Sequence, residues 1–484
     1  MNKIYYLLSL LLALPLSSCN DWLDVNPRSQ IKSEVLFETE DGFKQAVNGV
    51  YIRLAQTDLF GKNANMYIPE TMARMWSVPL QNSNLSMYSI ANYDFTESGA
   101  EDINNKTLSA YYNAIAQCND ILENLDNTSV KFTNGNDRLI RGELTGLRAF
   151  LHLDILRLWG PYPDNATGST TAIPYVTEMT NAVDKLRSKT WDEVVGLIEK
   201  NLNDAESILA EVDPYTYADA DSLNRTSPSY YVGKGTMPKD EWQMQRRARF
   251  SYYAVLGTKA RFYHWIGDTE NAVKYAKMVV DDEKFKLCTA STMTWTLVPE
   301  HLFGTDNINM LTDIETDFDS ENASFTQAAN AVNTAYETSA QPGDIRAGRY
   351  WKNKTYGNGV TTHVFCKYIG NEQTDSDYRV PLLRYAEMYL ILIEDLPLAE
   401  AQTYFETYRL ARGLSETMAN SMFATESSRL AQLEKEWRKE FWGEGQMFAF
   451  YKKHHYTAFT WPSNVSLPEN ALIVPMPKGI TNFE

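Results

Sequence analysis

Cysteine is scarce in this chain, with four residues among 484. So few cysteines exclude a disulfide-dense scaffold and any zinc module built from repeated cysteines. Positive charge is also in short supply, because 45 lysines and arginines face 62 aspartates and glutamates, for a formal net charge of −17. A nucleic acid is therefore not expected as a partner, since phosphate binding needs a basic face.

Long apolar runs and catalytic motifs are missing as well. After the first 16 residues no apolar stretch is long enough to cross a bilayer. The chain has no zinc-protease helix motif, no Cys-x-x-Cys, no nucleophile elbow and no phosphate-binding loop. Paired carboxylates carry little weight among 62 acids. We therefore expect no catalytic residue, no cofactor and no bound metal.

The six histidines are scattered. His454 and His455 could ligate a metal in principle, but adjacent residues on a helix point to different sides. Such a pair at a helix end is more typical of charge that complements the helix dipole. His152 and His264 lie inside helical patterns and are interpreted as packing residues.

The N-terminus has the layout of an export signal. Residues 1–3 carry a lysine, residues 4–16 form a short apolar stretch, and Leu16-Ser17-Ser18-Cys19 has the form of a bacterial lipoprotein box. We therefore expect residues 1–18 to be a lipoprotein signal peptide and Cys19 to be the lipidated residue. The acyl chains would then hold the protein on a membrane.

Helical periodicity dominates the rest of the chain. Apolar residues recur at steps of three and four in several segments, and Thr190-Trp191-Asp192-Glu193 is a capping box. Gly267 is expected to end one helix in the left-handed region, and Asp268 is expected to cap the next. The predicted fold is all-α, with helices in antiparallel pairs at 40–56 with 107–126, 137–159 with 190–210, 250–266 with the helix after Asp268, and 383–396 with 398–412.

Three long stretches break this pattern, at 57–105, 211–245 and 285–380. They are rich in Asn, Ser, Thr, Asp, Gly and aromatic residues, and have little regular structure beyond a short strand expected at 360–368. Long irregular segments in a compact domain are often functional. We predict one domain over 19–484, with a tether at 19–36 and these excursions as its ligand-binding part.

Aromatic residues are abundant, at 12 % of the chain. Rings outside the helical stripes are candidates for ligand binding, because the C–H edges of sugars stack on aromatic faces. Each ring could instead plug its own loop onto the scaffold. Arg74, Asn82, Asn84 and Asn92 are polar neighbours that could bind ligand hydroxyl groups. The candidate ligand-binding aromatic residues are Trp76, Tyr88, Tyr93, Trp295 and Trp351.

Several segments, in order along the chain, resemble the SusD/RagB family of outer-membrane lipoproteins from Bacteroidetes. The segments taken together are more specific for this family than any single segment. The segments are CNDWLDVNP at 19–27, FETEDGFKQAVNGVY at 37–51, RGELTGLRAFLHLDILRLWGPYP at 141–163, IPYV at 173–176, RARFSYYAVLGTKARFYHWIGDTENAVKYA at 247–276, VPLLRYAEMYLI at 380–391, LEKEWRKEFWGEGQMFAFYK at 433–452 and LIVPMPKGI at 472–480.

The resemblance implies a fold and a function. Members have four tetratricopeptide-like helix pairs and an irregular ligand-binding half with little β structure. They sit on the outer membrane facing the cell exterior, and hand oligosaccharides, or in some members peptides, to a TonB-dependent (SusC-like) barrel transporter. They bind without cleaving. The sequence departs from the family pattern at the turn 395–398 and at 446–450, and the family's ligand residues follow no motif that could be carried over.

Two other functions remain open at this point. A peptide-capturing lipoprotein of the same architecture would carry the same signal and scaffold. A lipid-anchored glycoside hydrolase would need two carboxylates at a set distance across a cleft, which spacing along the sequence does not show. A pure protein-binding scaffold is a further alternative, because stacked helix pairs serve that role in many proteins.

Overall fold

The computed structural model describes residues 35–180, 186–224, 238, 240–307, 310–357, 359, 361–370, 379–415 and 420–478. The expected signal peptide, the expected lipidation site at Cys19 and residues 19–34 of the tether lie outside these ranges. Across the described residues, no helix has both the length and the apolar character needed to span a bilayer.

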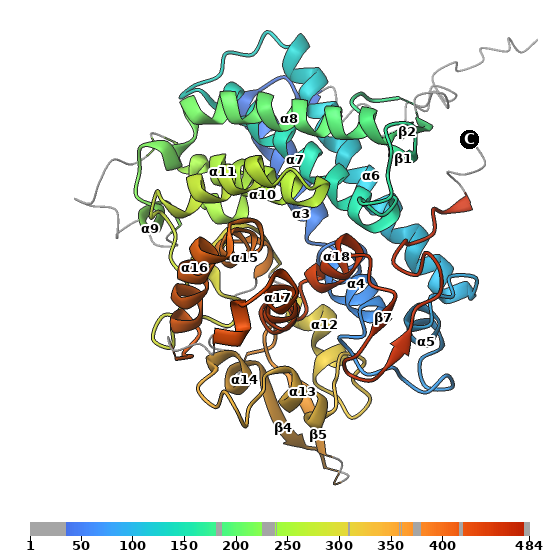
Figure 1. Cartoon of the computed structure of the whole chain (residues 1–484). Helices are drawn as coiled ribbons and strands as arrows, with labels where there is room; N and C mark the ends of the chain where they lie inside the picture. The colour runs from blue at the N-terminus through green and yellow to red at the C-terminus, as the bar shows by residue number, and fades with distance from the viewer. Residues whose placement is uncertain are drawn as a thin grey trace, which may run out of the picture.

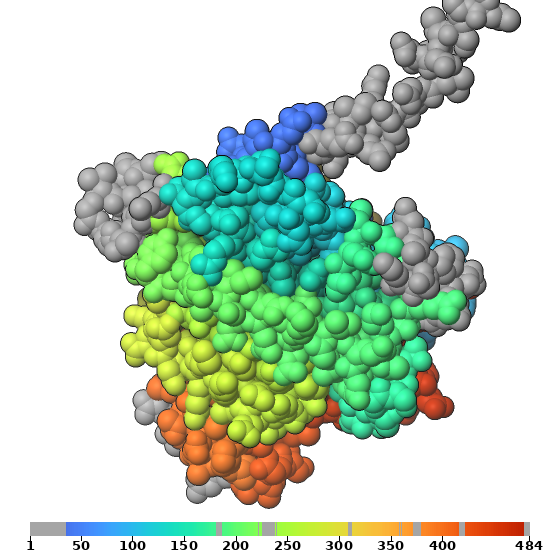
Figure 2. All heavy atoms as spheres, turned by 90° about the horizontal axis from the view of Figure 1, so that it is seen from above, coloured from blue at the N-terminus to red at the C-terminus, as the bar shows by residue number. Residues whose placement is uncertain are grey.

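Four pairs of contacting helices form the scaffold, as the periodicity predicted. Their order along the chain follows the order of the pairs in space (Figure 1). Figure 2 shows the pairs as successive bands of colour on one face, from blue and cyan through green and yellow to orange. The pairs are α3 (Glu40–Leu54) with α6 (Ser98–Asn127), α7 (Asn136–Trp159) with α8 (Trp191–Val212), α10 (Tyr252–Ile266) with α11 (Thr269–Val280), and α15 (Tyr385–Asp395) with α16 (Leu398–Ala411).

Several of these helices begin or end at the capping residues that the sequence indicated. Thr190 and Glu193 form the expected capping box at the start of α8. Gly267 ends α10 with φ +81°, and the Asp268 side chain accepts a hydrogen bond from the backbone N–H of Asn271 at the start of α11. The sequence predicted that α6 begins at residue 107, but the helix begins at Ser98. The prediction was too late because the first turns of the helix are polar and the apolar stripe begins only after them.

The other half of the molecule is built from shorter elements. Most of them lie below or to the right of the helix pairs in Figure 1, whereas α9 lies at the left. The expectation of little regular structure in 57–105 and 285–380 is wrong, since several short helices form there. These shorter helices are α4 (Ile68–Met72), α5 (Leu85–Ala91), α9 (Ala220–Leu223), α12 (Met310–Phe318), α13 (Ala329–Ala335) and α14 (Ile345–Tyr350), followed by the longer α17 (Glu426–Glu440) and the short α18 (Gln446–Lys453).

Strands are few and short in the described ranges, where they form two-stranded antiparallel sheets. The strand expected at 360–368 is β5, which pairs with β4 so that Trp351 lies opposite Phe365. The strand pairs are β1 (Thr171–Pro174) with β2 (Ser188–Thr190), β3 (His301–Asp306) with β6 (Arg379–Arg384), β4 (Trp351–Thr355) with β5 (Thr361–Phe365), and β7 (Ala458–Phe459) with β8 (Val465–Ser466).

A buried ionic network joins the fourth helix pair to the short elements. Glu440, at the end of α17, accepts from Arg384 at 2.6 Å, from Arg412 at 2.8 Å and from Arg346 at 2.9 Å. Burial alone would raise the pKa of Glu440, but the three guanidinium charges hold it well below its usual range. The Glu440 network comprises Glu300, Asp344, Arg346, Lys367, Arg384, Arg412, Glu436, Lys439, Glu440 and Glu444.

Two smaller buried ion pairs join the helix pairs to each other. Glu143 on α7 binds Arg246 at 2.5 Å and Arg249 at 2.9 Å, both just before α10. Arg261 on α10 donates two hydrogen bonds to Glu387 on α15, at 2.6 and 2.5 Å. Arg249 and Arg261 each bind their carboxylate through two guanidinium nitrogens, which restricts the geometry in which the partners meet. These contacts fix the register of neighbouring helix pairs.

We predict that Glu440→Gln lowers the free energy of unfolding by about 3–5 kcal/mol, because it leaves buried guanidinium charge without its counter-charge. Urea unfolding followed by tryptophan fluorescence measures this. The control is Glu211→Gln, whose partner Arg138 is 48 % exposed while Glu211 is 63 % exposed. It should cost less than about 1 kcal/mol. Equal costs in the two variants would contradict a structural role for the network.

Candidate functional site

A buried carboxyl group, that of Glu70, holds the excursion at 57–105 against the loop at 443–445. Glu70 on α4 accepts hydrogen bonds from the backbone N–H of Gly443 at 2.9 Å and of Gly445 at 2.8 Å. Both glycines have positive φ, of +77° and +73°. A Cβ at Gly445 would lie 2.8 Å from Pro69 Cγ, so the loop can approach α4 only with glycine there. This contact fixes α4 and the residues that follow it.

Two residues of the excursion have a left-handed backbone although neither is glycine. Arg74 has φ +61° and Tyr93 has φ +62°. Such conformations are costly for side chains with a Cβ and persist where the surroundings enforce them. Glu70 anchors the chain just before Arg74, and Trp76 anchors it just after. Backbone strain of this kind clusters at ligand-binding sites, so it marks this region for attention.

Arg74 is 8 % exposed, and its side chain lies against the half-buried Tyr93 ring, near α5. The Arg74 guanidinium lies 5.8 Å from the centre of the Tyr93 ring, and its Nη2 donates to Asn92 Oδ1 at 3.3 Å. Asn92 Nδ2 donates to the carbonyl of Tyr88 at 2.8 Å. Burial raises the pKa of the Tyr93 phenol, although the positive charge of Arg74 lowers it. We call Arg74, Tyr88, Asn92 and Tyr93 the Arg74 surface.

A second loop borders the Arg74 surface. The Ser77 N–H donates to the Thr326 carbonyl at 2.7 Å, and Asn84 Nδ2 donates to Ser324 Oγ at 3.3 Å. Between these two contacts, Leu80 is 80 % exposed. The border therefore combines amide and hydroxyl groups with an exposed apolar side chain, and it is built from segments about 240 residues apart in the sequence.

Trp76 and Trp351 lie in a buried aromatic cluster. Trp76 is 1 % exposed, stacks on Phe325 at 5.2 Å, and donates from Nε1 to the Met66 carbonyl at 2.7 Å. The ring of Trp351, 5 % exposed, lies 4.9 Å from that of Trp442. The cluster comprises Trp76, Phe318, Phe325, Tyr336, Tyr350, Trp351, Phe365, Tyr368, Trp442 and Trp461.

Trp295 lies apart from this cluster. It is 6 % exposed and packs on Val364 and Cys366. The Arg349 guanidinium lies 4.1 Å from its ring and the Lys352 ammonium 5.1 Å, so cation–π contacts cover the ring.

The structure thus separates the five candidate aromatic residues into two groups. Tyr88 and Tyr93 are half-buried at one surface, next to the Arg74 and Asn92 side chains that the sequence offered as polar neighbours. Trp76, Trp295 and Trp351 are buried, which is the alternative in which a ring plugs its own loop. Ligand binding by the two tyrosines stays a prediction. Sequence reasoning missed Glu70, whose role depends on a pair of glycines nearly 375 residues away.

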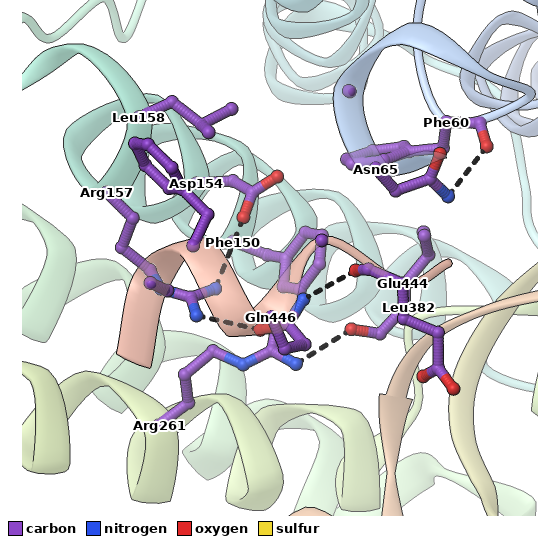
Figure 3. Close-up of a pocket in the computed structure, with 14 residues that line it drawn as sticks. Phe60, Asn65, Phe150, Asp154, Arg157, Leu158, Arg261, Leu382, Glu444 and Gln446 are labelled. Atoms are coloured by element: carbon purple, nitrogen blue, oxygen red, sulfur yellow. Dashed lines mark hydrogen bonds and ion pairs between the residues drawn. The ribbon is translucent and has the colours of Figure 1, made fainter. Parts of the chain in front are cut away.

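The internal pocket in Figure 3 is no ligand site for an oligosaccharide. Its volume is about 20 Å³, which is room for a single water molecule. Arg157 and Arg261 point into it, and Arg157 bonds Gln446 at 2.7 Å and Asp154 at 3.4 Å (Figure 3). The pocket lies between α7, α10 and the start of α18, where buried charges are paired.

A larger groove of about 530 Å³ follows one side of α6. Leu108, Ile115 and Val176 line it with aliphatic groups, and Tyr112 adds an aromatic ring. Tyr112 uses its hydroxyl to donate to the Pro174 carbonyl at 2.9 Å. Asn105 and Ser109 add polar groups to the groove, which has one tyrosine in its lining where the Arg74 surface has two.

A comparison with protein families finds one match within the chain. Residues 21–220 match the SusD-like_3 family, described as "Starch-binding associating with outer membrane". Among curated proteins, the SusD-like protein P25 of Formosa agariphila is 24 % identical over 239 residues, which are 47 % of this chain and 41 % of that protein. The matched part thus spans less than half the length of that relative.

Solved structures share the fold over nearly the whole chain. A "putative sugar binding protein" from Bacteroides vulgatus has a TM-score of 0.67 at 18 % identity, and the match covers 92 % of this chain and 97 % of that one. "Surface glycan-binding protein A" from Bacteroides fluxus has a TM-score of 0.64 at 17 % identity, covering 92 % and 96 %. At these identities the likeness establishes the fold.

We predict that Trp76→Ala lowers the free energy of unfolding by about 3–5 kcal/mol, because it opens a cavity in the aromatic cluster. Tyr88→Ala should change it by less than about 1 kcal/mol, since this ring is half-buried at the surface. Denaturant unfolding of both variants measures the difference. A Trp76→Ala protein as stable as the wild type would contradict the packing role.

A further prediction concerns pH. Burial raises the pKa of the Glu70 carboxyl to about 8, against the lowering effect of the two glycine N–H groups, from an ordinary value of 4.5. The folded state thus keeps a proton that the unfolded chain releases between these values, so the contribution of Glu70 to stability is present below pH 4.5 and lost as the pH rises through 8.

The expected result is that wild type loses stability relative to Glu70→Gln as the pH rises from 4.5 to 8. Urea midpoints taken across this range for both proteins measure it, with Glu211→Gln as a control that should follow the wild type. A constant difference between wild type and Glu70→Gln would contradict the raised pKa.

Proposed function

Since the chain belongs to the SusD-like family, we propose that it is a surface lipoprotein that captures oligosaccharides and delivers them to a TonB-dependent barrel transporter without cleaving them. The proposal includes a signal peptide at 1–18, lipidation at Cys19, and a single domain anchored in the outer membrane and facing the cell exterior. The relatives' descriptions as starch-, sugar- and glycan-binding proteins support the ligand class.

The Arg74 surface is the observation that carries the proposal. Two half-buried phenol rings give apolar faces against which the C–H side of a sugar can pack. Asn92 adds an amide, and the Arg74 guanidinium adds fixed donors that pair well with ligand oxygens. Arg74 has an Nε–H that is buried without a hydrogen-bond partner, so its orientation is set by packing. A site with two tyrosine rings, an amide and a guanidinium suits hydroxyl-rich ligands.

Neither of the two carboxylates that follow Tyr93 has the raised pKa of a general acid. Hydrogen bonds from the Thr96 side chain and backbone lower the pKa of Asp94. Hydrogen bonds from the backbone N–H of Gly99 and Ala100 lower the pKa of Glu97, which caps α6. Both groups are therefore ionised, whereas a glycosidase needs one carboxylic acid that keeps its proton at working pH.

Calorimetric titration of the chain from residue 20 tests the proposal. The panel contains starch-derived, host, plant and microbial oligosaccharides and a peptide pool, and each mixture is checked afterwards for products. We predict that one oligosaccharide class binds without turnover. Arg74→Ala and Tyr93→Ala should each weaken binding about tenfold or more, equivalent to about 1.4 kcal/mol.

Tyr217→Ala is the matched control, because Tyr217 is an exposed tyrosine in another excursion. It should bind as the wild type does. Release of products would overturn the non-catalytic assignment, and binding of peptides alone would favour the peptide-capturing alternative. Unchanged oligosaccharide affinity in both Arg74→Ala and Tyr93→Ala would move the site away from the Arg74 surface.

A further inference from the structure

Three helices that are distant in sequence end at one buried point. His264 near the end of α10, Glu394 near the end of α15 and His454 directly after α18 converge there. His264 Nε2 lies 3.5 Å from Glu394 Oε1, and His454 Nε2 lies 3.0 Å from the same oxygen. We call these three residues with Asp395 the His264 cluster.

Two separations within the cluster are close to those of neighbouring ligands around one metal ion. Zinc binds imidazole nitrogen and carboxylate oxygen at about 2.0–2.1 Å, which places neighbouring tetrahedral ligands about 3.3–3.4 Å apart. One imidazole–carboxylate distance is 3.5 Å and the other 3.0 Å. Side-chain ligand atoms of His264, Glu394 and Asp395 also lie within 4.8 Å of one another. Two imidazoles and a carboxylate form a donor set typical of divalent transition metals.

Two atoms of the cluster are buried and lack a hydrogen-bond partner. They are His454 Nε2 and Glu394 Oε2. His454 Nε2 makes no hydrogen bond although Glu394 Oε1 is 3.0 Å away, so the ring nitrogen is not directed at that oxygen. Glu394 is 8 % exposed, and a buried carboxylate oxygen without a partner is destabilising. A cation bound between the two side chains would satisfy both atoms.

Asp395 orients one of the two imidazoles. Its Oδ2 lies 2.7 Å from His264 Nδ1, which leaves Nε2 of the same ring facing Glu394. A carboxylate on the outer nitrogen is the usual support of a metal-binding histidine, because it fixes the tautomer and the ring orientation. The His454 ring is positioned by Phe450, with ring centres 4.6 Å apart.

Lys453 competes for the same carboxylate. Its Nζ lies 2.5 Å from Glu394 Oε1, and its side chain is 17 % exposed, so the ammonium can move outward along its flexible stem. His455, next to His454, points elsewhere: its ring stacks on Tyr162 and bonds Asp164 at 2.9 Å. His455 therefore takes no part in the cluster and offers a matched control.

We propose that His264, Glu394 and His454 form a binding site for a divalent transition-metal ion such as Zn²⁺, with Asp395 positioning His264. Binding displaces the Lys453 ammonium from Glu394. The ion joins the ends of α10, α15 and α18, and so connects the third and fourth helix pairs with α18. This site is separate from the Arg74 surface and does not depend on the ligand proposed there.

The test uses the full chain, freed of metal by a chelator and titrated with Zn²⁺ alone. We expect about one zinc per chain by elemental analysis after dialysis, and a rise in the thermal midpoint with zinc. Co²⁺ should give the visible absorption of a four- or five-coordinate site. His264→Gln, Glu394→Gln and His454→Gln should each weaken zinc binding at least tenfold, while His455→Gln should bind as the wild type.

The zinc affinity of Lys453→Met distinguishes a metal site from a purely structural ion pair. Removal of the competing ammonium should tighten zinc binding several-fold. His454 lies just beyond the end of α18, so we expect His454→Gln to fold even if the variants at the more deeply buried positions do not. No saturable zinc uptake by the wild type, or equal uptake by the wild type and His454→Gln, would overturn the proposal. So would weaker zinc binding in Lys453→Met.

Discussion

Glu440 and the three arginines around it hold the two halves of this molecule in one arrangement. The carboxylate lies at the end of α17, while its partners come from β6, α14 and the end of α16. Buried charges of this kind are tolerated only when each is paired, so no element of the set can move alone. Five acids face five bases in the network, which keeps the buried charge balanced.

The Arg74 surface depends on this arrangement through Glu444. Glu444 belongs to the network, and the glycines on either side of it donate to Glu70 on α4. α4 in turn sets the course of the chain into Arg74, which is held in a left-handed conformation before the buried Trp76. The left-handed residue Arg74 thus lies between α4, which is tied to the network through Glu70 and the loop around Glu444, and the buried Trp76.

The segments that resembled a known family carry these buried charges. Glu143, Arg249, Arg384, Glu387 and Glu440 all fall in them. The resemblance therefore reflects how the scaffold is joined and says little about the ligand, which accords with a fold shared at 17–18 % identity. The residues of the Arg74 surface, which we propose bind the ligand, lie in a segment outside that pattern. This is why the fold and the family resemblance were accessible from the sequence while the proposed binding residues were not.

The sequence by itself determined the helix pairs, because periodicity, the capping box at Thr190 and the turn at Gly267 are local and act within a few residues. It could not rank Trp76 against Tyr88, since both lie in polar stretches without a period. The tertiary structure decided that: residues about 240 positions away, near Ser324, enclose one ring and leave the other at the surface. The same holds for His264 and His454, which meet because three helices end together, and no spacing along the chain encodes that meeting.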